Sequence, residues 1–119
     1  MRIGIVGSRK RTDRQSVIDF VGTLNKSDTI ISGGCSGPDL WAEQAARDAG
    51  IDVLIFLPKL PPKGSPQYEF TKAFYARNQL IAENSDVIHA FTAHDRKGGT
   101  ENTIKYAQKI GVSIVIHEI

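Results

Sequence analysis

The chain has 119 residues, 40% of them hydrophobic and 24% charged, and a formal net charge of +2 at neutral pH. These values predict one globular domain over residues 1–119 and exclude both a disordered chain and a polycation that binds nucleic acid by charge alone. The single cysteine excludes an intrachain disulfide, and the short apolar runs exclude a membrane-spanning helix, so we expect a cytoplasmic protein without membrane contact.

Short apolar runs alternate with helical patterns from one end of the chain to the other. The predicted strands are residues 3–6, 29–31, 53–57, 87–91 and 112–116, and the predicted helices are residues 12–24, 38–49, 67–83 and 100–110. The continuous apolar run at 53–57 predicts a strand that is buried on both faces. Residues 58–66 hold four of the five prolines and predict an irregular surface loop. Gly50 and Gly111 are predicted to end the helices before them.

Five strands alternating with four helices predict an α/β fold. We expect a single doubly wound, Rossmann-like domain of five mostly parallel strands with helices on both faces. In such folds ligands bind beyond the carboxyl ends of the strands, near the point where the strand order reverses. The loops after the first, second and fourth strands are therefore the candidate site.

The loops after the second and fourth strands are rich in glycine, and each leads directly into a helix. Glycine lets the backbone approach a ligand closely, and a helix N-terminus offers free N–H groups and a positive dipole. These features indicate a phosphate cradle, although a tight strand-to-helix turn would use glycine as well. The candidate phosphate-binding residues are Gly33, Gly34, Ser36, Gly37, Gly98, Gly99 and the predicted N-cap Thr100.

Two acidic residues lie in the first turns of these helices. Asp39 either stabilises its helix or accepts hydrogen bonds from a ribose. Glu101 either stabilises its helix or contacts a sugar or a reacting bond.

The loop after the first strand carries Gly7, Ser8 and Arg9, and Arg9 is expected to grip phosphate at the mouth of the site. The neighbouring basic residues Lys10, Arg11 and Arg14 extend the patch or are simply solvated.

Arg77 lies on an otherwise apolar stripe of the third helical pattern, which also includes Phe70, Phe74, Leu80 and Ile81. An arginine in such a place either pairs with a carboxylate at the core edge or reaches a ligand. Asn78 beside it either fixes a base or sugar edge or makes a local hydrogen bond.

Several common site patterns are absent. The first strand is not followed by the G-x-G-x-x-G dinucleotide fingerprint, and no P-loop motif is present. His89, His94 and His117 lack the spacing of metal ligands, and Cys35 has no evident histidine partner that would make it a nucleophile. We therefore expect neither a metal nor a bound cofactor.

Four motifs in the same order resemble the SLOG superfamily of Rossmann-like domains, and most of all its YspA-type branch, which is related to the DprA and LOG proteins. The resemblance covers nearly the whole chain. The motifs are Gly7-Ser8-Arg9 with Thr12-Asp13-Arg14, Ser32 to Asp39 with Ala42-Glu43, Tyr75-Ala76-Arg77-Asn78, and Gly99-Thr100 with Ala107.

The resemblance implies a nucleotide or nucleotide-derived ligand, such as a nucleoside phosphate or an ADP-ribose-like molecule, held by a sensor or carrier. One alternative is a LOG-like nucleoside monophosphate N-glycosidase, for which Arg77 and Glu101 are the candidate catalytic residues. The two glutamates of the LOG pattern are replaced here by Asn102 and Thr103. A second alternative is DprA-like binding of single-stranded DNA, although proteins of that type carry flanking domains, for which 119 residues leave no space.

We also expect a homodimer. Phe70, Phe74 and Trp41 present more apolar surface than one sheet is expected to cover.

Overall fold

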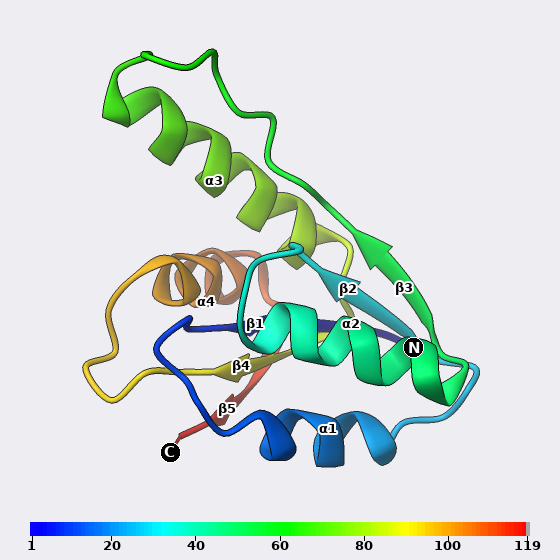
Figure 1. Cartoon of the computed structure of the whole chain (residues 1–119). Coiled ribbons are helices and arrows are strands. Elements are labelled where there is room, and N and C mark those ends of the chain that lie inside the picture. The colour runs from blue at the N-terminus through cyan, green and yellow to red at the C-terminus, as the bar shows by residue number, and fades with distance from the viewer. Residues whose placement is uncertain (119) are drawn as a thin grey trace.

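Strands and helices alternate strictly in the computed structural model, which describes residues 1–118 (Figure 1). The strands are β1 (Arg2–Gly7), β2 (Thr29–Ser32), β3 (Asp52–Ile55), β4 (Val87–Phe91) and β5 (Ser113–His117). The helices are α1 (Arg14–Gly22), α2 (Pro38–Ala49), α3 (Gln67–Glu83) and α4 (Gly99–Ile110). Among the described residues, none of the helices combines the length and the apolar character of a membrane span.

The strands form one five-stranded sheet in the order β3-β2-β1-β4-β5, and every neighbouring pair is parallel. The chain builds outward from β1 through β2 to β3, then returns to the other side of β1 with β4 and β5. The strand order therefore reverses between β1 and β4, whose last paired residues are Gly7 and Phe91. The predicted doubly wound, Rossmann-like α/β fold is confirmed.

Helices cover both faces of the sheet, with α1 and α2 on one side and α3 and α4 on the other (Figure 1). Neighbouring strand residues alternate between two apolar clusters, because successive side chains of a strand point to opposite faces. In β1, Ile5 packs in the cluster under α1 and α2, whereas Val6 packs in the cluster under α3 and α4. Ile30 and Ile31 of β2 divide in the same way.

The predicted C-terminal ends of α2 and α4 are confirmed, whereas the predicted N-cap of α4 is wrong. Gly50 and Gly111 end α2 and α4 with φ angles of 75° and 82°, as predicted from their preference for left-handed backbone. The prediction that Thr100 is the N-cap of α4 is wrong. The N-cap is Gly98, whose φ of 108° suits glycine, and Thr100 lies within the first turn.

Strand β3 is not buried on both faces, so that prediction is wrong. It lies at the edge of the sheet and pairs with β2 alone, which leaves Leu54 38% exposed and Leu57, just beyond it, 68% exposed. The apolar run at 53–57 therefore belongs to an edge strand, whose outer side has no neighbouring strand.

Helix α3 packs on the sheet through its second half only. Its buried residues are Arg77, Asn78, Ile81 and Ala82, and its first half stands away from the sheet (Figure 1). The predicted apolar stripe is wrong at Phe74 and Leu80, which are 38% and 42% exposed. Phe74 lies near the half of the helix that extends past the sheet, where apolar residues have no core beneath them. Leu80 lies in the packed half, but on its solvent-facing side. The preceding residues 58–66 form the irregular loop that was predicted.

Candidate functional site

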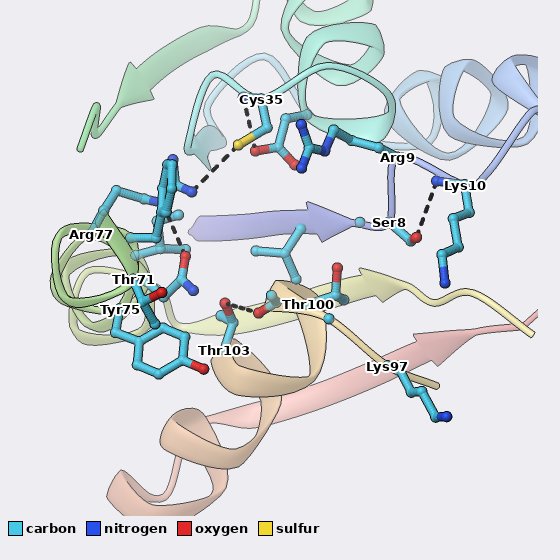
Figure 2. A pocket seen from close by; sticks show the side chains of 18 residues that line it. Ser8, Arg9, Lys10, Cys35, Thr71, Tyr75, Arg77, Lys97, Thr100 and Thr103 are labelled. Carbon is cyan, nitrogen blue, oxygen red and sulfur yellow. Dashed lines mark hydrogen bonds between the residues drawn. The ribbon is translucent and has the colours of Figure 1, made fainter. Parts of the chain in front are cut away.

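A cavity of about 760 Å³ opens at the point where the strand order reverses (Figure 2). Four segments far apart in the sequence contribute to it: the end of β1 with its loop, the loop after β2, the inner face of α3 and the start of α4. The lining residues are Val6, Gly7, Ser8, Arg9, Lys10, Cys35, Asp39, Thr71, Phe74, Tyr75, Arg77, Asn78, Ile81, Lys97, Gly98, Gly99, Thr100 and Thr103.

Most of the predicted ligand-binding residues meet at this cavity. Those that line it are Gly7, Ser8, Arg9, Asp39, Arg77, Asn78, Gly98, Gly99 and Thr100. Those that do not are Gly33, Gly34, Ser36, Gly37 and Glu101. The loop after β2 therefore reaches the cavity through Cys35, and not through its glycines, while Asp39 reaches it from the first turn of α2.

A carboxylate of the protein itself binds backbone N–H groups of the glycine-rich loop after β2. Oδ2 of Asp39 accepts hydrogen bonds from the backbone N–H of Gly33 at 3.2 Å and of Cys35 at 3.4 Å. The N–H of Gly34 donates to the hydroxyl of Ser32 at 3.4 Å. In this conformation the protein itself takes the N–H groups that a bound phosphate would use.

Burial also changes the acidity of this carboxyl. Loss of water around Asp39, which is 5% exposed, raises its pKa to about 7. The hydrogen bonds from Cys35 and Gly33 and the nearby positive charge of Arg77 act in the opposite direction, but more weakly. Asp39 therefore changes its protonation state close to neutral pH.

Arg77 of α3 also donates hydrogen bonds to the loop after β2. Its Nη1 donates to the carbonyl oxygen of Gly33 at 2.7 Å, its Nη2 to the sulfur of Cys35 at 3.4 Å, and its Nε to Asn78 at 3.0 Å. The guanidinium also lies 5.9 Å from the centre of the Phe74 ring. Arg77 thus faces the cavity and fixes its wall, with a carbonyl oxygen as its main partner where the sequence suggested a carboxylate.

The loop after β1 packs tightly against the start of α2. A Cβ atom on Gly7 would lie 2.4 Å from the Pro38 ring, so glycine is needed there for packing. The hydroxyl of Ser8 accepts a hydrogen bond from the N–H of Lys10 at 3.1 Å. The Arg9 side chain is exposed and extends from the end of β1 toward the side of the cavity that holds Cys35 (Figure 2).

The predicted basic patch is only partly correct. Arg11 is 3% exposed and donates to the carbonyl oxygens of Thr92 at 3.0 Å and His117 at 2.6 Å. It also forms an ion pair with Asp13. Arg11 therefore satisfies carbonyl groups at the ends of β4 and β5 and does not extend the mouth of the cavity.

Of the other two residues predicted to extend this patch, Lys10 alone reaches the cavity. It lines the cavity and forms an ion pair with Asp95. Arg14 is not among the lining residues and donates to Gln44 at 3.0 Å.

The start of α4 is the more open of the two glycine-rich loops. A Cβ atom on Gly98 or Gly99 would meet nothing within 4 Å, so the space in front of this helix start is free. Thr100 and Thr103 follow on the cavity side, and the Thr103 hydroxyl donates to the carbonyl oxygen of Gly99 at 3.3 Å. The positive end of the α4 dipole therefore faces an accessible cavity.

Glu101 lies beside this helix start but points to a different partner. Both of its carboxylate oxygens accept hydrogen bonds from Arg96, each at 3.0 Å. The neighbouring Asn102 accepts a hydrogen bond from Asn78 at 3.1 Å.

The charged residues that line the cavity are mostly basic. Within the described part of the chain, Asp39 is the one carboxylate among them, beside the basic residues Arg9, Lys10, Arg77 and Lys97.

Some lining residues were not proposed from the sequence, above all Thr71 and Tyr75 on α3 and Thr103 on α4. A signal for the first two was present. Thr71 and Tyr75 precede Asn78 at helical spacing and therefore lie on the same side of the helix.

A scan of protein-family models finds no match to this chain, and a search of curated proteins finds none either. Among solved structures, the chain is similar to the X-ray structure of DNA processing protein A (DprA) from Streptococcus pneumoniae, with a TM-score of 0.80 and 20% sequence identity. The match covers 97% of this chain and 49% of that one, so the chain spans about half the length of DprA. At this identity the likeness shows the fold: the chain has the Rossmann-like α/β architecture that is found in DprA.

Proposed function

We propose that the chain binds a nucleotide or nucleotide-derived ligand in this cavity, as a sensor or carrier. The observation that carries the proposal is the open, glycine-lined start of α4, which faces a cavity bordered by basic side chains. A cavity of about 760 Å³ is also within the range that small-molecule ligands occupy.

The start of α4 is the preferred place for a phosphate. Gly98 and Gly99 leave room for phosphate oxygens, and the helix dipole favours their negative charge. Arg9 and Lys97 are exposed side chains at the same cavity and supply compensating charge. The loop after β2 is a less suitable place because Asp39 already accepts hydrogen bonds from the backbone N–H groups of Gly33 and Cys35.

The rest of the cavity suits a nucleoside. Phe74 and Tyr75 offer aromatic surface, and Asn78 offers an amide that is suited to the edge of a base or sugar. Asp39 retains the predicted role of ribose acceptor as part of this proposal.

Titration calorimetry with AMP and with adenosine tests the proposal. AMP should bind more tightly than adenosine, because only AMP carries the phosphate. Arg9→Ala should weaken AMP binding about tenfold and leave adenosine binding nearly unchanged. The matched control is Arg14→Ala, which removes an exposed arginine whose partner is Gln44. Absence of binding at millimolar AMP, or equal affinity for both ligands, would contradict the proposal.

A second proposed function is binding of single-stranded DNA. Its support is the fold that the chain shares with DNA processing protein A, together with the basic lining of the cavity. A mobility shift of an oligothymidine strand that weakens steeply with salt would support it, and no shift at low salt would exclude it. The N-glycosidase alternative has less support, since Glu101 is engaged by Arg96 and does not line the cavity.

We also propose a cytoplasmic homodimer. Trp41 packs against the apolar cluster under α1 and α2, and Phe74 borders the cavity, so neither is a clear contact for a partner. The support comes instead from Leu57 and Leu60, which are 68% and 56% exposed in the segment between β3 and α3. Light scattering of the purified chain distinguishes a dimer from a monomer.

A further inference from the structure

A second, shallower groove of about 460 Å³ runs along the outer side of α3. It is lined by Tyr68, Thr71, Lys72, Tyr75, Ala76 and Gln79. These positions follow the spacing of one helical stripe, so they share one face of α3. The first half of α3 stands clear of the sheet, which leaves this face free (Figure 1).

The groove and the cavity adjoin each other at two residues of α3. Thr71 and Tyr75 line both of them, and both residues stand at the edge of the cavity in Figure 2. Thr71 and Tyr75 therefore form the common border of the two hollows, and a ligand that occupies both has to pass over this border.

The groove has the chemistry of a nucleobase platform. Tyr68 and Tyr75 are 67% and 45% exposed, and exposed aromatic rings bind bases by stacking. Lys72 lies between the two tyrosines on the same face and gives the groove a positive charge, which favours an anionic ligand. An aromatic, a basic and a second aromatic residue thus follow one another along the helix.

We propose that the outer face of α3 is a second nucleobase subsite, and that the ligand is a dinucleotide whose two nucleosides are joined through phosphates. The phosphates and the first nucleoside occupy the cavity, and the second base stacks in the groove of Tyr68 and Tyr75. This inference rests on the proposed nucleotide function and extends it, because a mononucleotide would leave the groove empty.

Calorimetry with diadenosine diphosphate and with ADP-ribose tests the inference. Both probes contain an adenosine, a pyrophosphate and a second ribose, but only the first carries a second base. Diadenosine diphosphate should bind about tenfold more tightly, which is the size expected for stacking of one base. Tyr68→Ala should abolish this difference and leave the ADP-ribose affinity unchanged, since Tyr68 lies outside the cavity. Tyr68→Phe keeps the ring and should keep the difference.

Three results would overturn the inference. Equal affinity for the two probes would remove the second subsite and leave the proposed nucleotide function intact. Absence of binding by either probe would remove both. A Tyr68→Ala variant that loses no selectivity but shifts from dimer to monomer in light scattering would assign the groove to a contact between copies of the chain.

Discussion

The guanidinium of Arg77 occupies the space in which a side chain at Gly33 would lie. Nη1 of Arg77 donates to the Gly33 carbonyl oxygen at 2.7 Å, and a Cβ atom on Gly33 would lie 2.6 Å from the same nitrogen. Gly33 is thus required for the approach of a helix residue 44 positions away.

Gly33→Ala should therefore force Arg77 out of place and lower the free energy of unfolding by roughly 1–3 kcal/mol, as other overpacked sites do. Denaturant unfolding measures the change. Gly22→Ala is the control, because a Cβ atom on Gly22 meets nothing within 4 Å, and alanine there should be neutral or slightly stabilising. In an Arg77→Ala background the cost of Gly33→Ala should shrink, and an undiminished cost would refute the steric explanation.

Arg11 should matter for stability far more than its position in a basic run indicates. Its side chain is 2% exposed and serves two backbone carbonyls and Asp13. Arg11→Ala should lower the free energy of unfolding by about 3 kcal/mol or more, because it leaves those acceptors without a donor. Arg14→Ala should change it by less than about 0.5 kcal/mol. Similar effects of the two variants in chemical denaturation would contradict this assignment.

Asp39 should make the protein less stable as the pH rises from about 4 to about 7. Burial raises the pKa of Asp39 from an ordinary 3.8 to about 7, so the folded state binds this proton more tightly than the unfolded state does. The contribution is complete below pH 3.8 and is lost as the pH passes 7. The free energy of unfolding, measured across this range for wild type and Asp39→Asn, should show the slope in the wild type minus variant difference. If this difference in the free energy of unfolding does not change with pH, the pKa of Asp39 is not raised.

His89 should make the protein more stable as the pH rises from about 4 to about 6.5, which is opposite to the effect of Asp39. Burial, and secondarily the charge of His117, lowers the pKa of His89 from 6.5 to about 4. Its Nδ1 lies 2.8 Å from Nε2 of His117, and its ring lies 4.2 Å from that of Phe20. The contribution is complete above pH 6.5 and is lost as the pH falls toward 4. NMR titration of the His89 ring should give a midpoint well below 6, and a midpoint near 6.5 would contradict the prediction.

Glu101→Gln should leave AMP affinity unchanged to within about twofold. The Glu101 side chain bonds to Arg96 on a surface loop and does not line the cavity. Thr100→Val is the comparison, because Thr100 is adjacent in sequence but borders the cavity, and its loss of a hydroxyl should weaken AMP binding about threefold or more. A large loss of AMP affinity in Glu101→Gln would return that carboxylate to the site.

The strands and helices and their order along the chain could be predicted from local signals. An apolar run marks each strand, and apolar residues at helical spacing mark each helix. The two glycine-rich loops could be located in the same way, but their roles could not be separated. In the loop after β2, Gly33 is a glycine because Arg77 approaches it, as Pro38 approaches Gly7 at the end of β1, whereas Gly98 and Gly99 in the loop after β4 face open space. The residues that make this difference lie far away in the sequence.

The basic run after β1 was ambiguous for the same reason. Arg9 and Arg11 are two residues apart, yet one is exposed and the other is buried against the carbonyl oxygen of His117, 106 positions away. Charge alone does not show which arginine meets a strand end that needs donors. Likewise, the composition of α3 did not show how much of the helix extends beyond the sheet.

The position of β1 in the middle of the sheet affects how the chain folds while it is being synthesised. Its neighbour β2 follows soon after it, but its other neighbour is β4, and Ile3 pairs with Val87. The ribosome synthesises β4 only after most of the chain has been made. One edge of β1 therefore stays unpaired until then. Contacts of such long sequence separation slow folding, and an unpaired apolar strand edge is prone to aggregation. Yield in cells should therefore depend on how quickly β4 reaches β1 as well as on the stability of the finished sheet.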